Sequence, residues 1–432
     1  MMTWKRTRGF LQAQIPLALL AAFILACGRP VIPVPSNRPL FAPVAGPFDA
    51  ALKARVVGEI GQELGARAYA GAVDFSGWSQ RVAKVQGTLD QAETPEAFSK
   101  ALNEVLRGYK VSHLSVSAEL ERGWEAPSFR HYGFRACAIP EGALVADVTV
   151  GGSAAKAGLR RGDVLTHLNG QPIRVKDIQL CGDLLRLQGK RRTQPIVLEV
   201  ACGQAPLHGS ASLSWVNPEV ALIRIPSFRS PAYDLAAIQK MVTQIQKSKG
   251  LVLDLRFNEG GDLANFRHLA THLWPGGNKT LAWSITKPME EAYRKVHGRP
   301  GNAASIASWA KLPYDFVGLR GPDRYAGPLV VLCDRWSASA AEMLLAAVQE
   351  LGRAKVVGMR TSGQVLEVPG DASGRYGCAL SGGFRLVYPS ALVLSPRLNI
   401  YEGKGVSPDV ELDLRTTLDD EAILAKALEL LR

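Results

Sequence analysis

Cysteine is scarce in this 432-residue sequence, and no cysteine spacing matches a metal site. Five cysteines follow position 27, and an odd number cannot all pair within one chain. At most one or two disulfides are therefore expected, formed among the first three. The five are Cys137, Cys181, Cys202, Cys333 and Cys378. His268 and His272 lie four residues apart, but the glutamate of an HExxH zinc motif is missing. We therefore expect neither a metal ion nor another cofactor.

Acidic residues are outnumbered by basic ones, 39 to 51, which gives a net charge of +12. Nucleic-acid-binding proteins interleave basic residues with exposed aromatics or carry a recognisable fold signature, and neither is visible here. Nucleic acid is therefore not an expected partner. Attraction to anionic lipid or to a carboxylate-bearing ligand is the better interpretation of the charge. The length and the hydrophobic content of 47% indicate two or three packed domains.

The N-terminal residues predict an export signal. Lys5, Arg6 and Arg8 precede an uncharged apolar run at residues 17–26, which is short for a membrane span of about 20 residues. The run ends in ILACG, which resembles a bacterial lipobox. We expect residues 1–26 to be a lipoprotein signal peptide and Cys27 to carry the lipid; a plain signal peptide or an uncleaved anchor is the alternative. The residue after Cys27 is glycine and not aspartate, which favours a location at the outer membrane, facing the periplasm.

Two segments follow the leader. Residues 27–47 are rich in proline and predict an extended linker. Residues 48–129 show apolar residues at three- and four-residue spacing, which predicts a helical N-terminal domain. Thr94 and Pro95 mark one helix start, with threonine as the cap and proline at the first helical position.

Residues 130–206 have the texture of short strands and glycine turns, with a helix expected near residues 176–187 and a strand at 195–202. The strings GSAAKAGLRRGDVL and LNGQP resemble the PDZ domain, a small β fold with two helices. The resemblance implies that a peptide is bound as an added strand, with its terminal carboxylate held by backbone N–H groups. In this sequence the matching loop is Tyr132, Gly133 and Phe134.

Residues 207–432 have an α/β rhythm, with apolar strands expected at residues 220–225, 250–255, 329–333 and 355–357 and a helix at 417–431. Ser339 stands where a strand turns sharply into an amphipathic helix. A hydroxyl at a helix N-terminus is suited to nucleophilic chemistry, because free N–H groups and the dipole favour developing negative charge. The alternative is that Ser337 and Ser339 only cap the helix.

Three strings in this segment, DLRFNEGGDL, SASAAE and EGKGVSPD, resemble in order the motifs of the S41 serine peptidases, the C-terminal (tail-specific) processing proteases and their tricorn-like relatives. The resemblance implies a multidomain α/β protein with a crotonase/ClpP-like peptidase core. It places the nucleophile at Ser339. The oxyanion would be bound by the amides of Ala340 and of Gly260 or Gly261.

The residue at the position of the catalytic base differs from that in one branch of the family. That branch uses the lysine of a TFGKG string, and the corresponding residue here is Gln364, whose amide has no usable basicity. The tricorn-like branch uses a histidine preceded by serine, together with a glutamate. The resemblance therefore implies His113 as the base, Ser112 as the residue that orients it and Glu402 as the acid. Asp254 and Arg256 are expected to pair locally.

The sequence thus predicts a lipid-anchored serine endopeptidase of the cell envelope whose PDZ domain binds a substrate polypeptide, with the polypeptide's C-terminus as one candidate. The alternative is a catalytically inactive, S41-like lipoprotein that serves as a peptide-binding module; Gln364 is its best support. The residues specify neither the cleavage sequence nor the oligomeric state.

Overall fold

The computed structural model describes residues 47–118, 129–180, 182–205, 209–274, 278–311, 313–317, 324–370 and 375–432. The predicted signal peptide, Cys27, nearly all of the proline-rich linker and Cys181 lie outside these ranges. No helix within them is long and apolar enough to cross a membrane.

The N-terminal region is helical because its apolar residues recur on one helix face. In the first helix Val56, Ile60 and Leu64 are buried at four-residue intervals. Thr94 accepts a hydrogen bond from the Ala97 amide and Pro95 begins the helix, as predicted. The elements are α2 (Ala50–Ala66), α3 (Trp78–Ala83), α4 (Gln86–Asp90), α5 (Pro95–Arg107) and the strand β1 (Ser115–Ala118).

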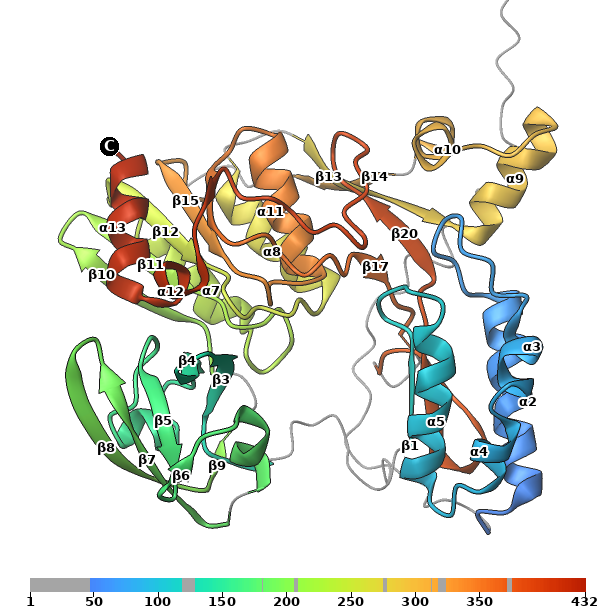
Figure 1. Cartoon of the computed structure of the whole chain (residues 1–432). Coiled ribbons are helices and arrows are strands. Elements are labelled where there is room, and N and C mark those ends of the chain that lie inside the picture. Colours follow the sequence, from blue (N-terminus) through green and yellow to red (C-terminus); the bar gives the residue numbers. More distant parts are fainter. Residues whose placement is uncertain are drawn as a thin grey trace, which may run out of the picture. The chain divides into compact units, whose positions relative to one another are not determined.

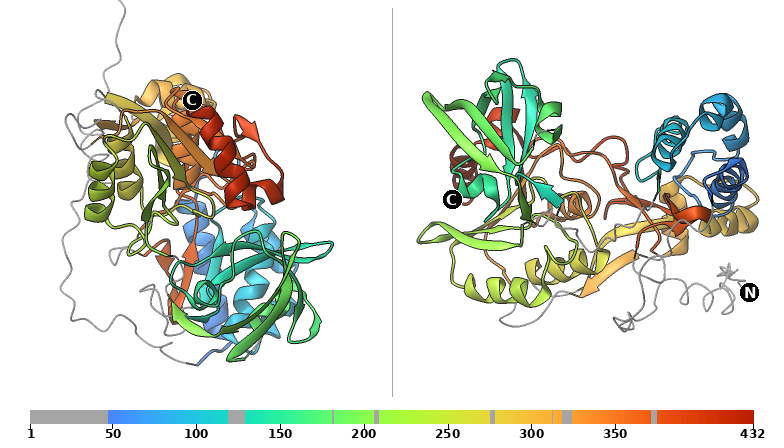
Figure 2. Two further views of the ribbon diagram at one scale, coloured as in Figure 1. Left: turned by 90° about the vertical axis from the view of Figure 1, so that its left-hand side faces the viewer. Right: turned by 90° about the horizontal axis from the view of Figure 1, so that it is seen from below.

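The core of this helical region includes residues from the other end of the chain. Phe384 packs edge-on against Phe98, with ring centroids 5.7 Å apart. β1 pairs in antiparallel fashion with β19 (Phe384–Val387), which also pairs with β18 (Cys378–Ala379). Figure 2 shows this C-terminal ribbon beside the blue N-terminal helices. The region therefore depends on the C-terminal segment for its core.

The PDZ-like segment forms a sheet in the order β3-β4-β5-β7-β8. The predicted helix at 176–187 is wrong beyond its first turns: a short 3₁₀ helix is followed by a strand, in which Leu185 and Leu187 are buried and Arg186 is exposed. This alternation of period two suits a strand. The elements are β2 (Phe129–His131), β3 (Phe134–Ile139), β4 (Gly142–Val148), α6 (Ser153–Lys156), β5 (Val164–Leu168), β6 (Gln171–Pro172), η1 (Val175–Leu180), β7 (Leu184–Arg191), β8 (Gln194–Ala201) and β9 (Gly203–Ala205).

No disulfide joins the described cysteines, and Cys181, one of the three for which pairing was expected, lies outside the described residues. Cys137, Cys202, Cys333 and Cys378 are all free thiols. Cys137 and Cys333 are buried, where they act as small apolar side chains.

The α/β core is built on a sheet in the order β10-β11-β12-β15-β16-β21, parallel from β11 onward. Its central strands are apolar on both faces because helices cover both: Leu251 and Leu253 face the cluster containing α7, α8 and α11, whereas Val252 faces α13. Figure 1 shows α8 and α11 on one side and α13 on the other. The elements are β10 (Ser212–Asn217), β11 (Val220–Arg224), α7 (Leu235–Gln244), β12 (Gly250–Asp254), α8 (Leu263–Leu273), β15 (Leu329–Cys333), α11 (Ala340–Glu350), β16 (Lys355–Gly358) and β21 (Val410–Glu411).

A second sheet, in the order β14-β13-β20-β17, flanks this core. The predicted C-terminal helix is present but is divided in two, because Asp419 ends one helix and caps the next. The remaining elements are β13 (Asn278–Thr286), α9 (Lys287–His297), α10 (Ala303–Ala310), β14 (Pro313–Val317), β17 (Leu366–Glu367), η2 (Ser381–Gly383), β20 (Ala391–Leu394), α12 (Leu414–Leu418) and α13 (Asp420–Leu430). The predicted multidomain α/β class is confirmed.

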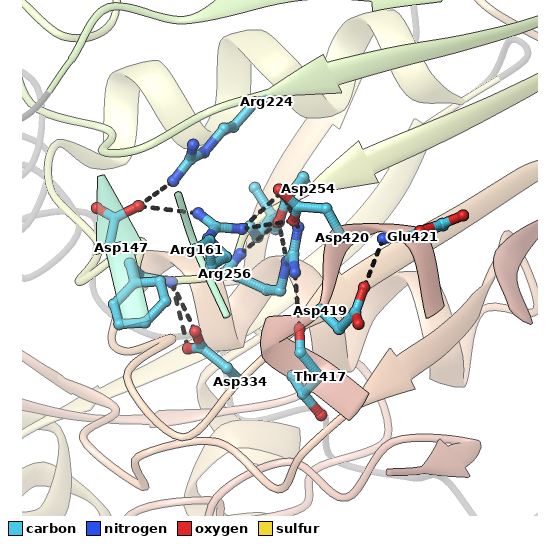
Figure 3. A network of polar contacts seen from close by, with 12 residues as sticks. Asp147, Arg161, Arg224, Asp254, Arg256, Asp334, Thr417, Asp419, Asp420 and Glu421 are labelled. Atoms are coloured by element: carbon cyan, nitrogen blue, oxygen red, sulfur yellow. Dashed lines mark hydrogen bonds and ion pairs between the residues drawn. The ribbon is translucent and has the colours of Figure 1, made fainter. Parts of the chain in front are cut away.

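A buried network of charges joins the PDZ-like segment to the end of β12 (Figure 3). Arg161, only 4% exposed, donates to Asp147 on β4 and forms an ion pair with Asp254 over 3.6 Å. Asp254 also accepts from Arg256, so the predicted local pairing is confirmed. Arg256 extends the network to Asp420 on α13 over 2.6 Å. Charges this deeply buried are tolerated because each has partners of opposite sign.

The residues that follow β12 make further apolar and polar contacts with the PDZ-like segment. Phe257 packs in one cluster with Leu144 and Val164 of the PDZ-like segment. Two residues further on, Glu259 forms an ion pair with Arg135 on β3 over 2.5 Å. The loop that leads to Gly260 is therefore anchored against the PDZ-like sheet.

Candidate active site

Ser339 occupies the tight turn between β15 and α11, at the N-cap of the helix. Its φ of +55° lies in a region that residues other than glycine rarely adopt, at a cost of about 1–3 kcal/mol. The preceding turn is held by Asp334, whose carboxylate accepts from the amides of Trp336 and Ser337 at 2.9 and 3.0 Å. Burial raises the pKa of Asp334 to about 6.

The two serines of this turn have different roles. The Ser337 hydroxyl is fully buried, donates to the Leu255 carbonyl over 2.9 Å and accepts from the Asp334 amide over 3.0 Å. It is a structural group. Ser339 is partly exposed, and no hydrogen bond in the described part of the chain engages its hydroxyl as a donor.

Gly260 lies against Ser339. A Cβ on Gly260 would come within 2.6 Å of Ser339 Cβ and 2.9 Å of the Ala340 nitrogen, so only glycine fits this position, and its φ is +90°. The Gly260 amide donates to Asn258 Oδ1 over 2.9 Å. Among the described residues no acceptor meets the amides of Ala340 or Gly261. Of the two glycines that the sequence offered, the geometry favours Gly261 as the second oxyanion donor.

Ser112, His113 and Glu402 form a hydrogen-bonded chain across 290 residues. The Ser112 hydroxyl lies 2.7 Å from His113 Nδ1 and donates to Glu402 Oε2 over 3.0 Å. The Ser112 amide donates to Glu402 Oε1 over 2.8 Å. The loop after β20 therefore brings Glu402 to the segment that follows α5.

This chain of contacts fixes the tautomer of His113. Ser112 has one hydroxyl proton, which it donates to Glu402 Oε2, so Ser112 Oγ accepts the Nδ1 proton of His113. Nε2 is then left with its lone pair. Burial, followed by the positive charge of Arg229, lowers the pKa of His113 to about 4, so the ring is neutral at pH 7.

No hydrogen bond among the described residues links the His113 ring to the Ser339 hydroxyl. The two halves of the site meet through one loop instead. The Gln364 amide donates to Glu342 over 2.8 Å, and the next amide, that of Val365, donates to Glu402 over 2.7 Å. Glu342 also accepts from the Ser339 amide over 3.1 Å. A single loop thus positions both carboxylates.

Glu342, in the first turn of α11, does more than complement the helix dipole. Its carboxylate is fully buried and also accepts from the Thr361 hydroxyl at 2.5 Å and the Gly363 amide at 2.7 Å. Burial raises its pKa, and these hydrogen bonds oppose the rise. Sequence reasoning missed this role; the signal available was an acid three residues after Ser339.

The side chain of Gln364 is exposed, and only its backbone amide contacts Glu342. Arg229, which acts on His113, was also missed, because nothing in its sequence context distinguishes it from a surface arginine. No group of three or more metal-binding side chains occurs among the described residues.

The predicted peptide-binding loop leads into β3, an edge strand of the PDZ-like sheet. The carbonyls of Tyr132 and Gly133 accept from the amides of Ala154 and Thr149 at 2.9 and 2.8 Å, which ties the loop to the glycine-rich turn before α6. Phe134 begins β3 and packs on the segment's apolar core. An exposed strand edge beside such a loop can accept an added strand.

Two segments of the chain match known protein families. Residues 219–412 match peptidase family S41, and residues 144–197 match a PDZ domain. The chloroplastic C-terminal processing peptidase of Tetradesmus obliquus is 27% identical over 291 residues, 61% of this chain and 55% of that protein. A tricorn protease homolog of Streptomyces coelicolor is 27% identical over 384 residues, 82% of this chain and 30% of that protein. The chain therefore spans about half, or less, of the length of these curated relatives.

The fold itself has been seen in solved structures. A photosystem II D1 C-terminal processing protease superimposes with a TM-score of 0.53 at 21% sequence identity, over 86% of this chain and 98% of that one.

Proposed function

Because the chain contains a peptidase family S41 domain and a PDZ domain, we propose that it is a serine endopeptidase that works through Ser339 and His113. The observation that carries the proposal is the Ser112 hydroxyl held between His113 Nδ1 and Glu402. A histidine oriented in this way presents an unprotonated Nε2, which a general base requires.

The proposed reaction begins when His113 Nε2 takes the proton of the Ser339 hydroxyl and the oxygen attacks the scissile carbonyl. The amides of Ala340 and Gly261 bind the oxyanion that forms. His113 then returns the proton to the leaving amine, and an acyl group remains on Ser339. Water, activated by the same imidazole, releases the acyl group. Ser112 and Glu402 stabilise the imidazolium during both steps.

Ser339 and His113 must approach each other for this reaction, since they share no hydrogen bond in the described structure. Unliganded sites often tighten only when substrate binds. The loop that carries Gln364 and Val365 contacts both Glu342 and Glu402, so its movement can bring the two halves together.

The PDZ domain is proposed to bind the substrate polypeptide along β3, with the loop of Tyr132, Gly133 and Phe134 receiving its C-terminus. The signal in residues 1–26 and the lipobox cysteine Cys27 support anchoring in the cell envelope, at the outer membrane facing the periplasm. No cofactor takes part.

A binding protein without catalytic activity is the second candidate. Gln364 at the lysine position and the missing contact between His113 and Ser339 both favour it. In that case the PDZ domain would be the functional module and the peptidase domain a scaffold.

Labelling with a fluorophosphonate separates the two candidates. The peptidase proposal expects the wild-type protein to be labelled on Ser339 and Ser339→Ala to remain unlabelled. Ser337→Ala is unsuitable as a control because its hydroxyl holds the turn; Ser305→Ala, on the far helix α10, is the matched serine variant and should label normally. A wild-type protein that never labels, even with peptides that occupy the PDZ domain, would establish the binding role.

A further inference from the structure

Arg229 lies beside the proposed oxyanion donor. Its amide donates to Ser227 Oγ over 3.1 Å, which fixes the backbone after β11. A Cβ placed on Gly261 would come within 2.6 Å of the Arg229 nitrogen and 2.8 Å of its Cγ. The arginine therefore flanks Gly261 directly, as Ser339 flanks Gly260.

The side chain of Arg229 is oriented by an aromatic ring. Its guanidinium carbon lies 5.1 Å from the ring centroid of Tyr376, and the Tyr376 hydroxyl donates to Asp262 Oδ1 over 2.7 Å. This contact holds the side chain of Arg229, and a planar guanidinium has five N–H donors that can engage a carboxylate in a fork. The residue is only partly buried, so a ligand can reach it.

Arg229 lies near enough to His113 for its charge to act on the ring. The groups that act on the His113 ring come from three loops: Ser112 beside it, Glu402 through Ser112, and Arg229 from the loop after β11. Arg229 is the charge among them that lowers the pKa of the ring. Arg229 therefore packs against the oxyanion donor Gly261, and its charge reaches the base.

We propose that Arg229 binds a carboxylate of the substrate on the leaving-group side of the scissile bond. The side follows from His113, which must face the leaving amine in order to return its proton. The carboxylate can come from an aspartate or glutamate side chain or from the C-terminus of the polypeptide. This inference rests on the proposed function and deepens it.

Binding of a carboxylate would also change the pKa of the base, His113. The positive charge of Arg229 opposes protonation of His113, and a paired carboxylate cancels that charge, so the pKa of His113 rises toward the neutral range when such a substrate binds. A base with a pKa nearer the working pH is more effective. The preferred substrate would therefore both bind better and make the site more reactive.

The test uses synthetic peptides in matched pairs, followed by mass spectrometry of the products. One set exchanges glutamate for glutamine at each of the first residues after the cleaved bond, and the other exchanges a C-terminal acid for an amide. We expect wild-type kcat/KM to favour the acidic member of at least one set by about tenfold, the effect of one charge-assisted hydrogen bond. Which set responds identifies the source of the carboxylate.

Arg229→Gln should remove this preference, and Arg229→Lys should keep part of it. Arg67→Gln is the matched control, because Arg67 also contacts a tyrosine, Tyr388, but lies at the C-cap of α2. With neutral peptides, Arg229→Gln should move the acid limb of kcat/KM to higher pH, a shift that a merely structural role would not produce.

The outcomes separate this inference from the function on which it rests. If the wild-type protein neither labels nor cleaves, the peptidase proposal fails. If Arg229→Gln labels normally and the wild type cleaves acidic and neutral peptides at equal rates, only the role of Arg229 is wrong. The pKa of His113, measured by NMR in Ser339→Ala and in the double variant with Arg229→Gln, needs no activity; equal values would overturn the electrostatic role.

Discussion

Ser112 and Glu402 lie 290 residues apart in the chain and share two hydrogen bonds, from the Ser112 amide and from its hydroxyl. The same hydroxyl meets His113 Nδ1 at 2.7 Å. This pair of contacts determines which nitrogen of the imidazole carries the proton, and so whether His113 can act as a base.

Replacing Glu402 by glutamine tests this relationship. An amide cannot accept at both positions, so one of the three donors that meet Glu402 would face an NH₂ group, and the Ser112 hydroxyl can reverse. Reversal protonates Nε2 and removes the base. We expect kcat to fall by about 10²-fold or more. Glu429→Gln, on the surface of α13, is the control; equal kcat values for the two variants would exclude Glu402 from the mechanism.

The pH profile should reflect the lowered pKa of His113. Catalysis needs the neutral ring, so kcat/KM with a neutral peptide should stay constant down to about pH 5 and fall with an acid limb near pH 4. A limb near 6.5, the value of an exposed histidine, would contradict the burial of the base.

The same shift has a consequence for stability. The folded ring has the lower pKa, so the unfolded chain binds the extra proton, and the contribution of His113 is complete above about pH 6.5 and is lost as the pH falls toward 4. His113→Gln should therefore lose less stability than the wild type over this interval, as measured by urea unfolding.

Substitution of Glu342 should have a large effect, whereas substitution of Gln364 should have a small one. Glu342→Gln removes a buried acceptor of four donors and should destabilise the protein by about 2–4 kcal/mol and displace Ser339. Gln364→Ala keeps the backbone amide that Glu342 uses, so kcat should change less than about threefold, within the range of a surface substitution. A large loss of activity in Gln364→Ala would show that its side chain takes part in catalysis.

The junction between the PDZ domain and the core depends on Arg161. Arg161→Met removes the positive charge that Asp147 and Asp254 share, so that Asp147 keeps Arg224 and Asp254 keeps Arg256, and the loss of these charged contacts should lower the free energy of unfolding by about 1.5–3 kcal/mol. Arg192→Gln, which breaks the exposed pair with Glu421, should leave it nearly unchanged. Urea unfolding measures both; similar values would mean that the network carries little of the stability.

Local patterns predicted much of the core. The apolar strand and the turn at Ser339 are recognisable because a five-residue buried strand is followed at once by an amphipathic helix. The pairing of Asp254 with Arg256 is likewise local. The helix predicted at 176–187 failed because leucines three and four apart fit a helix, yet Leu185 and Leu187 are buried on one face of a strand.

Local sequence patterns could not predict the contacts between segments that are distant in the chain. Only the resemblance to a family linked Ser112 with Glu402, since no periodicity joins residues so far apart. Arg161 and Asp254, or Phe98 and Phe384, meet because the chain folds back on itself, and their local sequence gives no sign of it. The choice between Gly260 and Gly261 required the hydrogen bond that the Gly260 amide donates to Asn258 Oδ1.

The most direct measurement is the rate of peptide hydrolysis by His113→Ala, with and without added imidazole. If His113 is the base, the variant should lose at least about 10²-fold in kcat. Free imidazole should restore part of that loss, while Ser339→Ala remains inactive with imidazole present. A His113→Ala variant that cleaves peptides as fast as the wild type would show that the proton of Ser339 is taken by another group.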